Sequence, residues 1–131
     1  MGHYLYFVLV DKSTAKDSKE ARESATEGLD NNDFVFSGGY FGGGRCDYFV
    51  IGGCWSGVLS NIEDDPERNI HQDYGYDDDA MILTKLLLKD LKKENKDVLC
   101  FIPSTYEELV IDALNKDHID EYWIVVVDYH I

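Results

Sequence analysis

Positive charge is scarce in this chain. Its 131 residues include 12 lysines and arginines against 26 aspartates and glutamates, which gives a net charge of −14. Proteins that bind nucleic acid take most of their affinity from lysine and arginine side chains that neutralise phosphates, so direct nucleic-acid binding is disfavoured. A basic protein surface, such as the groove of a nucleic-acid enzyme, is the complementary partner, although acidity by itself also confers solubility.

Cysteines and long apolar runs are also few. The three cysteines, Cys46, Cys54 and Cys100, cannot all pair, and none has a Cys-x-x-Cys spacing. We therefore expect reduced thiols, a cytoplasmic location, and neither a metal site nor a cofactor. No run approaches the roughly 18 apolar residues of a membrane span, so no membrane partner is expected. The apolar segment 4–10 lacks the basic flank of a signal peptide and predicts a strand instead.

The chain nevertheless has ample material for a core, with 44% hydrophobic and 13% aromatic residues. It shows neither repeats nor linkers, so residues 1–131 are expected to form a single domain. Apolar patterning predicts strands at 3–10, 33–37, 47–51, 54–60, 97–102 and 122–131, and helices at 13–27, 80–93 and 104–116. The order β-α-β-β-β-α-β-α-β favours an α+β fold with a mixed sheet covered by helices on one side. A ferredoxin-like core with an inserted β-hairpin is one arrangement that fits it.

The helix at 104–116 has the strongest local signal. It opens with two overlapping capping boxes, Ser104 with Glu107 and Thr105 with Glu108. The helix at 13–27 has a thin stripe of small residues that can lie close against a sheet, and Gly28 is its expected C-terminal cap.

The loop at 61–79 holds eight acidic residues and one arginine, a net charge of −7. A loop of this length inside a compact domain is typical of a functional or disordered segment. One interpretation is that its carboxylates imitate a run of phosphates. The other is that it is a solvated loop whose last aspartates cap the helix at 80–93. Its spacing does not fit an EF-hand calcium loop. The residues expected to meet a partner are Asp64, Asp65, Asp73, Tyr74, Tyr76, Asp77, Asp78 and Asp79.

Eight of the eleven glycines lie between residues 38 and 57, among aromatic residues. A phosphate-binding loop needs a helix after its glycines, but strands are predicted after both glycine clusters, so Gly52-Gly53 predicts the turn of a β-hairpin. Backbone amides beside Arg45 still allow an anion to bind without a helix. This small-molecule or nucleotide-binding alternative uses Arg45, Asp47, Tyr48, Gly52, Gly53, Trp55, Asp128 and His130.

Signals for catalysis are weak, because no serine elbow, Walker loop or paired-carboxylate motif is present. Asp128 and His130 would share one face of a strand, where the carboxylate would orient a general base; a surface hydrogen bond is the more ordinary role of such a pair. The sequence therefore favours a protein without enzymatic activity.

The segment "DYFVIGGCWSG" and the ending "VVVDYHI" together resemble an uncharacterised family of small phage and prophage proteins. The family signature runs Trp-Asp-Trp-Tyr-x-Ile-Gly-Gly-Arg-Trp, and its chains end near an Asp-x-His. The matching positions are Asp47, Ile51, Gly52, Gly53, Trp55, Asp128 and His130, with aromatic replacements at Tyr48 and Phe49. Cys46 and Cys54 stand where the family has its first tryptophan and its arginine. The resemblance implies a phage origin, and hence the host cytoplasm, but no activity.

These features lead to one main hypothesis and two alternatives. The main hypothesis is a phage-type accessory protein that binds and inhibits a host protein, with the acidic loop directed at a basic surface. In it, Tyr48 and Trp55 serve with the loop tyrosines as anchors. The first alternative is the nucleotide-binding or other small-molecule-binding protein described above. The second is a metal-dependent hydrolase that uses His71, Asp73 and Asp77 to Asp79.

Overall fold

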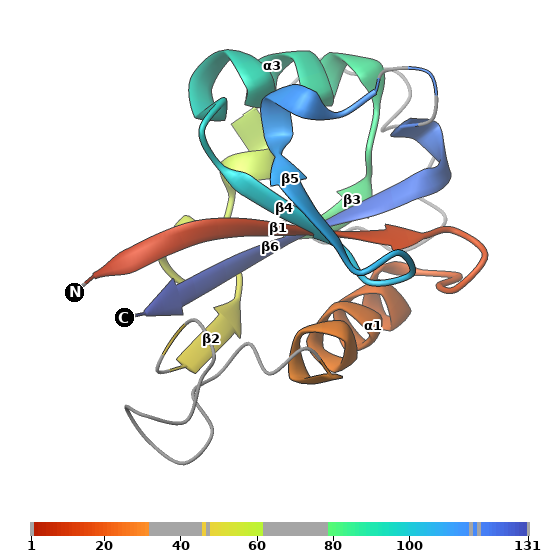
Figure 1. The fold of residues 1–131 in the computed structure, drawn as a ribbon, viewed down its shortest axis with the longest axis vertical. Coiled ribbons are helices and arrows are strands. Elements are labelled where there is room, and N and C mark those ends of the chain that lie inside the picture. Colours follow the sequence, from red (N-terminus) through yellow and green to blue (C-terminus); the bar gives the residue numbers. More distant parts are fainter. Residues whose placement is uncertain are drawn as a thin grey trace.

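Two long strands, β1 (His3–Asp11) and β6 (Tyr122–His130), form the centre of the structure (Figure 1). The computed structural model describes residues 2–31, 46, 48–61, 79–115, 117 and 119–130. β1 and β6 pair antiparallel along their full lengths. Five consecutive residues of β1 and seven of β6 are buried, as expected of strands covered on both faces.

The remaining strands complete a mixed sheet. They are β2 (Tyr48–Ile51), β3 (Ala80–Ile82), β4 (Leu99–Ile102) and β5 (Glu107–Val110). β4 runs parallel to β1 and β5 antiparallel to β4, which gives the order β2-β6-β1-β4-β5. β3 pairs with β6 on the same edge as β2, nearer the start of β6. The predicted α+β class with a mixed sheet is confirmed.

β2 and β3 meet at a single residue of β6, Val126. The amide of Gly52, just after β2, donates to the Val126 carbonyl at 2.8 Å. The amide of Val126 donates to the carbonyl of Asp79, just before β3, also at 2.8 Å. Two separate segments therefore supply one uninterrupted set of hydrogen bonds along this edge of β6.

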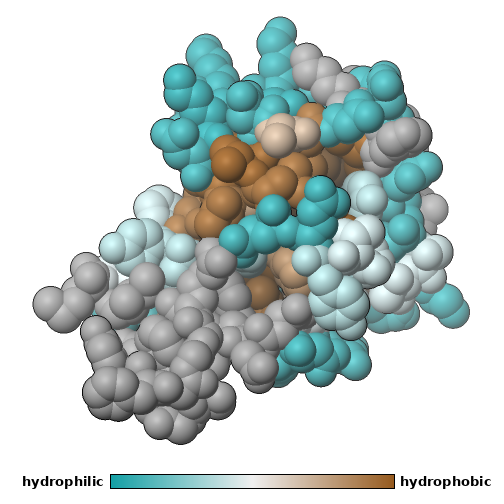
Figure 2. Space-filling model, viewed as in Figure 1, coloured by the Kyte–Doolittle hydropathy of each residue, from teal (hydrophilic) through white to brown (hydrophobic). Residues whose placement is uncertain are grey.

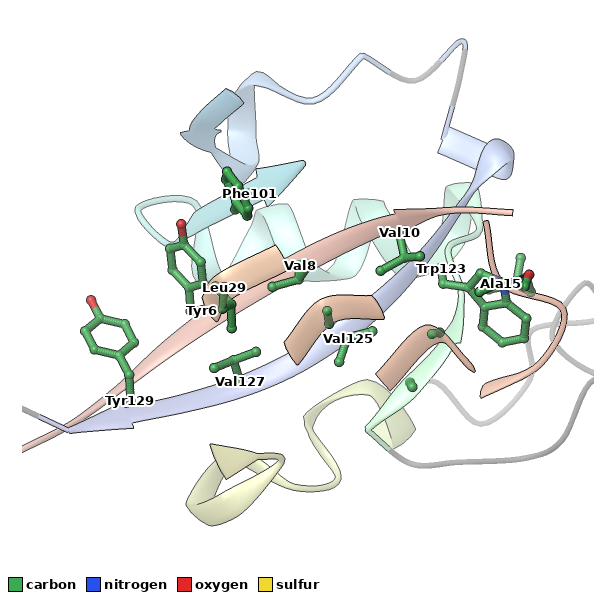
Figure 3. Packing of buried hydrophobic residues seen from close by; sticks show 14 of the residues in the cluster. Tyr6, Val8, Val10, Ala15, Leu29, Phe101, Trp123, Val125, Val127 and Tyr129 are labelled. Carbon is green, nitrogen blue, oxygen red and sulfur yellow. Dashed lines mark hydrogen bonds between the residues drawn. The ribbon is translucent and has the colours of Figure 1, made fainter. Parts of the chain in front are cut away.

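One helix covers each face of the sheet (Figure 1). α1 (Ser18–Asn31) packs on the face that carries Tyr6, Val8 and Val125 (Figure 3), and α3 (Lys85–Asn95) lies on the opposite face. The helices therefore do not share one side, as the sequence suggested and as a ferredoxin-like core would require. The reason is that β1 and β6 are apolar on both faces and need cover on both.

The predicted small-residue stripe of α1 is confirmed, since Ser18, Ala21, Ala25 and Leu29 are all buried. Gly28 is not the C-terminal cap, because the helix continues to Asn31. A Cβ at Gly28 would lie 2.8 Å from Cγ of Pro103, so the missing side chain lets the helix approach the turn after β4.

Residues 104–116 do not form the predicted helix. A turn follows Pro103, and then come β5 and a short 3₁₀ helix, Ile111–Ala113. Tyr106 ends this turn with a φ of 55°, which reverses the chain so that it pairs with β4. Four residue pairs between β4 and β5 satisfy backbone groups that β4 would otherwise leave open, and this pairing outweighs the local capping signals.

The predicted hairpin at Gly52-Gly53 is also absent. Both glycines have positive φ, 79° and 54°, as the turn chemistry requires. The chain then continues into 3₁₀ helices at Gly53–Trp55 and Val58–Asn61, where a strand was expected at 54–60. β2 pairs with the end of β6, a partner distant in the sequence, instead of with the segment that follows it.

The predicted helix at 80–93 divides into a strand and a helix. Ala80 to Ile82 are buried and pair with β6 as β3, and α3 begins three residues later. Its N-cap is Thr84, whose Oγ1 accepts a hydrogen bond from the Leu87 amide at 3.1 Å. Thr84 is therefore the N-cap, and Asp79, one of the aspartates expected there, is separated from α3 by the strand.

Some predictions concern residues outside the described ranges. These are the strand at 33–37 and all of the acidic loop except residues 61 and 79. Among the helices that the structure describes, none is both long and apolar enough to cross a membrane.

Replacing Thr84 by alanine should destabilise the protein. The Thr84 side chain is buried and caps α3, so Thr84→Ala leaves the Leu87 amide unpaired, and the free energy of unfolding should fall by about 1 to 2 kcal/mol. Urea unfolding followed by circular dichroism measures the change. Thr26→Ala is the matched control, since Thr26 lies inside α1 and donates to the Arg22 carbonyl; it should change stability by less than about 0.5 kcal/mol. Equal losses in the two variants would contradict the capping role.

Candidate functional site

Three aromatic rings form a row across the ends of β2, β6 and β1. Tyr48 stands opposite His130, and His130 stands opposite His3. The Tyr48 and His130 rings stack with centroids 5.1 Å apart and an interplanar angle of 11°, and the His130 and His3 rings meet edge to face at 5.0 Å. We call Tyr48, His130 and His3 the ring row.

Asp128 lies on the same face, two residues from His130 along β6. Its side chain is only 6% exposed, while that of His3 is 44% exposed. His3 Nδ1 lies 2.9 Å from Oδ1 and 3.1 Å from Oδ2 of Asp128, and the Cys54 amide donates to Oδ2 at 2.9 Å. One imidazole nitrogen, the Cys54 thiol sulfur and one carboxylate oxygen all lie within 4.8 Å of one another. We call His3, Cys54 and Asp128 the Asp128 cluster.

Gly53 makes this cluster possible. A Cβ at Gly53 would lie 2.3 Å from Oδ2 and 2.6 Å from Cβ of Asp128, closer than atoms can approach. Glycine also adopts the φ of 54° at low cost. The missing side chain therefore lets the turn after β2 lie directly on the buried carboxylate, and this places the Cys54 amide and thiol beside it.

The hydrogen bonds determine the charge of the cluster. Burial alone would raise the pKa of Asp128, but the bonds from the Cys54 amide, His3 and the Cys54 thiol outweigh it and lower the pKa below its usual value. Asp128 is therefore a carboxylate at neutral pH. Partial desolvation, followed by the hydrogen bond and the negative charge of Asp128, raises the pKa of the Cys54 thiol. Cys54 is therefore a thiol, not a thiolate.

A cleft of about 420 Å³ opens beside the cluster. His3 and Leu5 of β1 and Trp55 line it, together with Asn95, the last residue of α3, and Asp97 just after the helix. The Trp55 indole Nε1 is buried and donates no hydrogen bond within the described part of the chain. As far as the structure describes the chain, the cleft lining contains no lysine or arginine, so it suits a cation or a neutral group better than a phosphate.

The structure brings together six of the residues singled out for ligand binding. Tyr48, Gly52, Gly53, Trp55, Asp128 and His130 lie at or next to the ends of β2 and β6. Asp128 and His130 share a face as expected, and the imidazole bonded to the Asp128 carboxylate is that of His3. Arg45 and Asp47 lie outside the described residues.

Sequence reasoning missed His3 as a member of the site. The signal was weak, because His3 is 125 residues from Asp128 and reaches it only through the pairing of the first strand with the last. The sequence marks Cys54 only as the residue that stands where the phage-protein signature has arginine, and this does not predict its contact with Asp128. Only the register of β1, β6 and β2 places both side chains on one carboxylate.

Of the aspartates expected to meet a partner, the structure describes only Asp79. Asp79 is half-buried, with Oδ2 3.8 Å from Arg22 Nη1, and it packs against Gly52, where a Cβ would lie 2.4 Å from Oδ2. It therefore has a structural role at the start of β3. The other residues expected to meet a partner, and His71 of the hydrolase alternative, lie outside the described residues: Asp64, Asp65, Asp73, Tyr74, Tyr76, Asp77 and Asp78.

The arrangement does not favour nucleophilic catalysis by Cys54. In a cysteine-histidine pair the base must take the thiol proton, whereas here the Asp128 carboxylate lies against both groups and stabilises the protonated thiol. The cluster offers instead a nitrogen, a sulfur and an oxygen donor around one small volume.

Comparison of the chain with known protein families, curated proteins and solved structures finds no significant match.

Two glycine substitutions separate the contact at Asp128 from backbone strain. Gly53 and Gly57 both have positive φ, 54° and 89°, but a Cβ at Gly57 would meet nothing within 4 Å. Gly57→Ala should therefore lower the free energy of unfolding by about 1 to 2 kcal/mol, which is the cost of placing a side chain on a residue with positive φ. Gly53→Ala should lose at least about 1 kcal/mol more, because it must displace the Asp128 carboxylate. Thermal and urea unfolding measure both, and similar losses would show that the close approach is unimportant.

Replacing Asp128 by asparagine should cost stability in a pH-dependent way. The pKa of Asp128 is lower in the folded chain than its usual value, so its charge stabilises the fold at pH above about 4 and ceases to do so as the pH falls through the folded pKa. Asp128→Asn should therefore lose about 1 to 3 kcal/mol at pH 7, and this loss should shrink below about pH 4. Urea unfolding from pH 3 to pH 7 measures it. A loss that stays constant over that range would contradict the charge argument.

Proposed function

We propose that this chain is a small acidic binding protein that docks on a basic surface of another protein through the sheet edge formed by β2. The observation that carries the proposal is the exposure of Tyr48 and Val50, 46% and 48%, on one face of that strand. They stand two residues apart on β2, and Tyr48 stacks on the half-buried His130 of the ring row. Exposed apolar groups of this kind are typical anchors of a protein interface.

The charge of the chain selects the partner. A net charge of −14 favours a basic surface and repels an acidic one, so the expected partner carries clustered lysine and arginine residues. The acidic loop is connected to the same edge, because Asp79 at its end contacts Gly52 at the end of β2. Tyr48 and Val50 on β2 and the charges of the acidic loop would then contribute to one interface. The exposed side chains of β2 would provide affinity, and the charges would raise the association rate.

The resemblance to small phage proteins adds a biological setting to the proposal. A chain of this origin would act in the host cytoplasm, and covering the basic groove of a host nucleic-acid enzyme would inhibit that enzyme. This setting rests on the motif around Gly52-Gly53 and on the terminal Asp128 and His130.

The nucleotide-binding alternative has less support among the described residues. It requires the backbone amides after Gly52 to hold a phosphate, but the Cys54 amide already donates to Asp128. The carboxylates of Asp128 and Asp97 also make the neighbourhood of Trp55 negative. A phosphate would therefore meet repulsion at the place where it should bind.

A second apolar region provides the internal control. Figure 2 shows hydrophobic residues gathered over β4 and β5, below α3. β5 is the other edge of the sheet, with Val110 38% exposed and Tyr106, just before it, 69% exposed. Glu107 and Glu108 on this strand give it the charged character that protects an edge from pairing.

The test compares the two edges in capture experiments with the immobilised protein and host lysate. Tyr48→Ala should reduce the specifically captured protein at least about tenfold, as expected for loss of an aromatic anchor, while Tyr106→Ala should capture as much as the parent. Capture should also weaken steeply as salt rises. Quantitative mass spectrometry identifies the protein, and titration of the purified partner then gives the affinities.

Three results would overturn the proposal: capture that survives high salt, equal capture by Tyr48→Ala, or loss of capture by Tyr106→Ala alone. The last result would place the interface on β5. Circular dichroism of each variant excludes misfolding as the cause.

A further inference from the structure

We propose that the Asp128 cluster is a site for a transition-metal dication, Zn²⁺ by its donor set, which ties together the start of β1, the turn after β2 and the end of β6. The inference is independent of the partner-binding proposal, because it rests on a different group of atoms and predicts binding by the purified chain alone. It also revises the expectation from the sequence that the chain has no metal site.

The donor atoms are those that Zn²⁺ uses in proteins. Imidazole nitrogen, thiolate sulfur and carboxylate oxygen are its three usual protein ligands. The sulfur and nitrogen donors disfavour Ca²⁺ and Mg²⁺, which bind through oxygen atoms. His3, Cys54 and Asp128 supply one donor of each kind.

The spacing of the donors is close to what a metal requires. Their atoms lie within 4.8 Å of one another, with His3 Nδ1 already 2.9 Å from Asp128 Oδ1. Ligand atoms on a tetrahedral Zn²⁺ lie about 3.3 to 3.8 Å apart, given bond lengths of about 2.0 to 2.3 Å. Both His3 and Cys54 are exposed at the surface, so rotations of their side chains can close this small difference without moving the buried Asp128.

Residues around the cluster fix the positions of Asp128 and Cys54. The buried Asp128 accepts a hydrogen bond from the Cys54 amide, the kind of outer contact that orients a ligating carboxylate. Because Gly53 has no Cβ, the turn after β2 can lie directly against Asp128. Among the described residues, the cleft beside His3 is lined by Asp97 and by no lysine or arginine, which favours the approach of a dication.

Metal binding changes protonation in a defined way. The Cys54 thiol proton passes to solvent as the sulfur becomes a thiolate ligand. His3 binds the metal through Nδ1 as a neutral imidazole, so its single N–H hydrogen is carried on Nε2, which it reaches by exchange with solvent. The metal replaces the hydrogen bond between His3 and Asp128 with two coordinate bonds. Three protein ligands leave a fourth position, which water fills in a tetrahedral site.

The experiment uses tag-free, reduced, chelator-treated protein of the full chain. Zn²⁺ is titrated against a chromophoric chelator to obtain the stoichiometry and affinity, and Co²⁺ serves as the spectroscopic probe. We expect one equivalent of Zn²⁺ per chain, a thiolate-to-cobalt charge-transfer band in the near ultraviolet, and a higher melting temperature with Zn²⁺ present. Zn²⁺ should also slow alkylation of Cys54 in the native protein, since Cys46 and Cys100 are buried.

Variants distinguish this site from adventitious surface binding. Cys54→Ser changes an exposed side chain and should keep the fold, lose the charge-transfer band and weaken Zn²⁺ binding at least about tenfold. His3→Gln should weaken it similarly. Asp112→Asn, which removes an exposed carboxylate outside the cluster and the cleft, should bind Zn²⁺ as the parent does. The proposal is overturned if the parent binds no Zn²⁺, if Cys54→Ser binds it equally well, or if Co²⁺ gives no thiolate band.

Discussion

The pairing of β1 with β6 is the interaction on which the rest of the structure depends. It joins the first and last strands over nine residue pairs, and both strands are buried on both faces. A sheet centred on such a pair must have an apolar layer on each side, which α1 and α3 supply from opposite faces. The same pairing brings His3 to His130 and Asp128, so the register that builds the core also assembles the candidate site.

The second constraint is the close approach of Gly53 to Asp128. A buried carboxylate needs hydrogen-bond donors, and an amide in a turn can reach it only where no Cβ intervenes. Packing thereby explains the Gly52-Gly53 pair. Gly52 leaves room for Asp79 and Gly53 for Asp128, so each glycine lies against one carboxylate. The two glycines therefore leave room for two aspartate side chains, and they form neither a phosphate-binding loop nor a hairpin turn.

Much of the fold was predictable because it depends on local pattern. The continuous apolar runs predicted β1, β4 and β6, and the small-residue stripe predicted α1. Failures occurred where long-range pairing decided the outcome. Residues 107–110 became β5 because β4 needed a partner, and residues 80–82 became β3 because β6 had an open edge beyond Val126. The site was half predictable for the same reason: Asp128, Gly53 and Trp55 stood out locally, whereas His3 joins them only through the sheet register.

The meeting of β2 and β3 at Val126 has a consequence for how this chain tolerates change. Gly52 and Asp79 bond to the carbonyl and the amide of one residue, so the chain between them departs from and returns to the same point of the sheet edge. The entropy of closing a loop rises only slowly with its length. A change in the length of the chain between Gly52 and Asp79 therefore costs little closure entropy, while the two hydrogen bonds at Val126 keep β2 and β3 in register along β6.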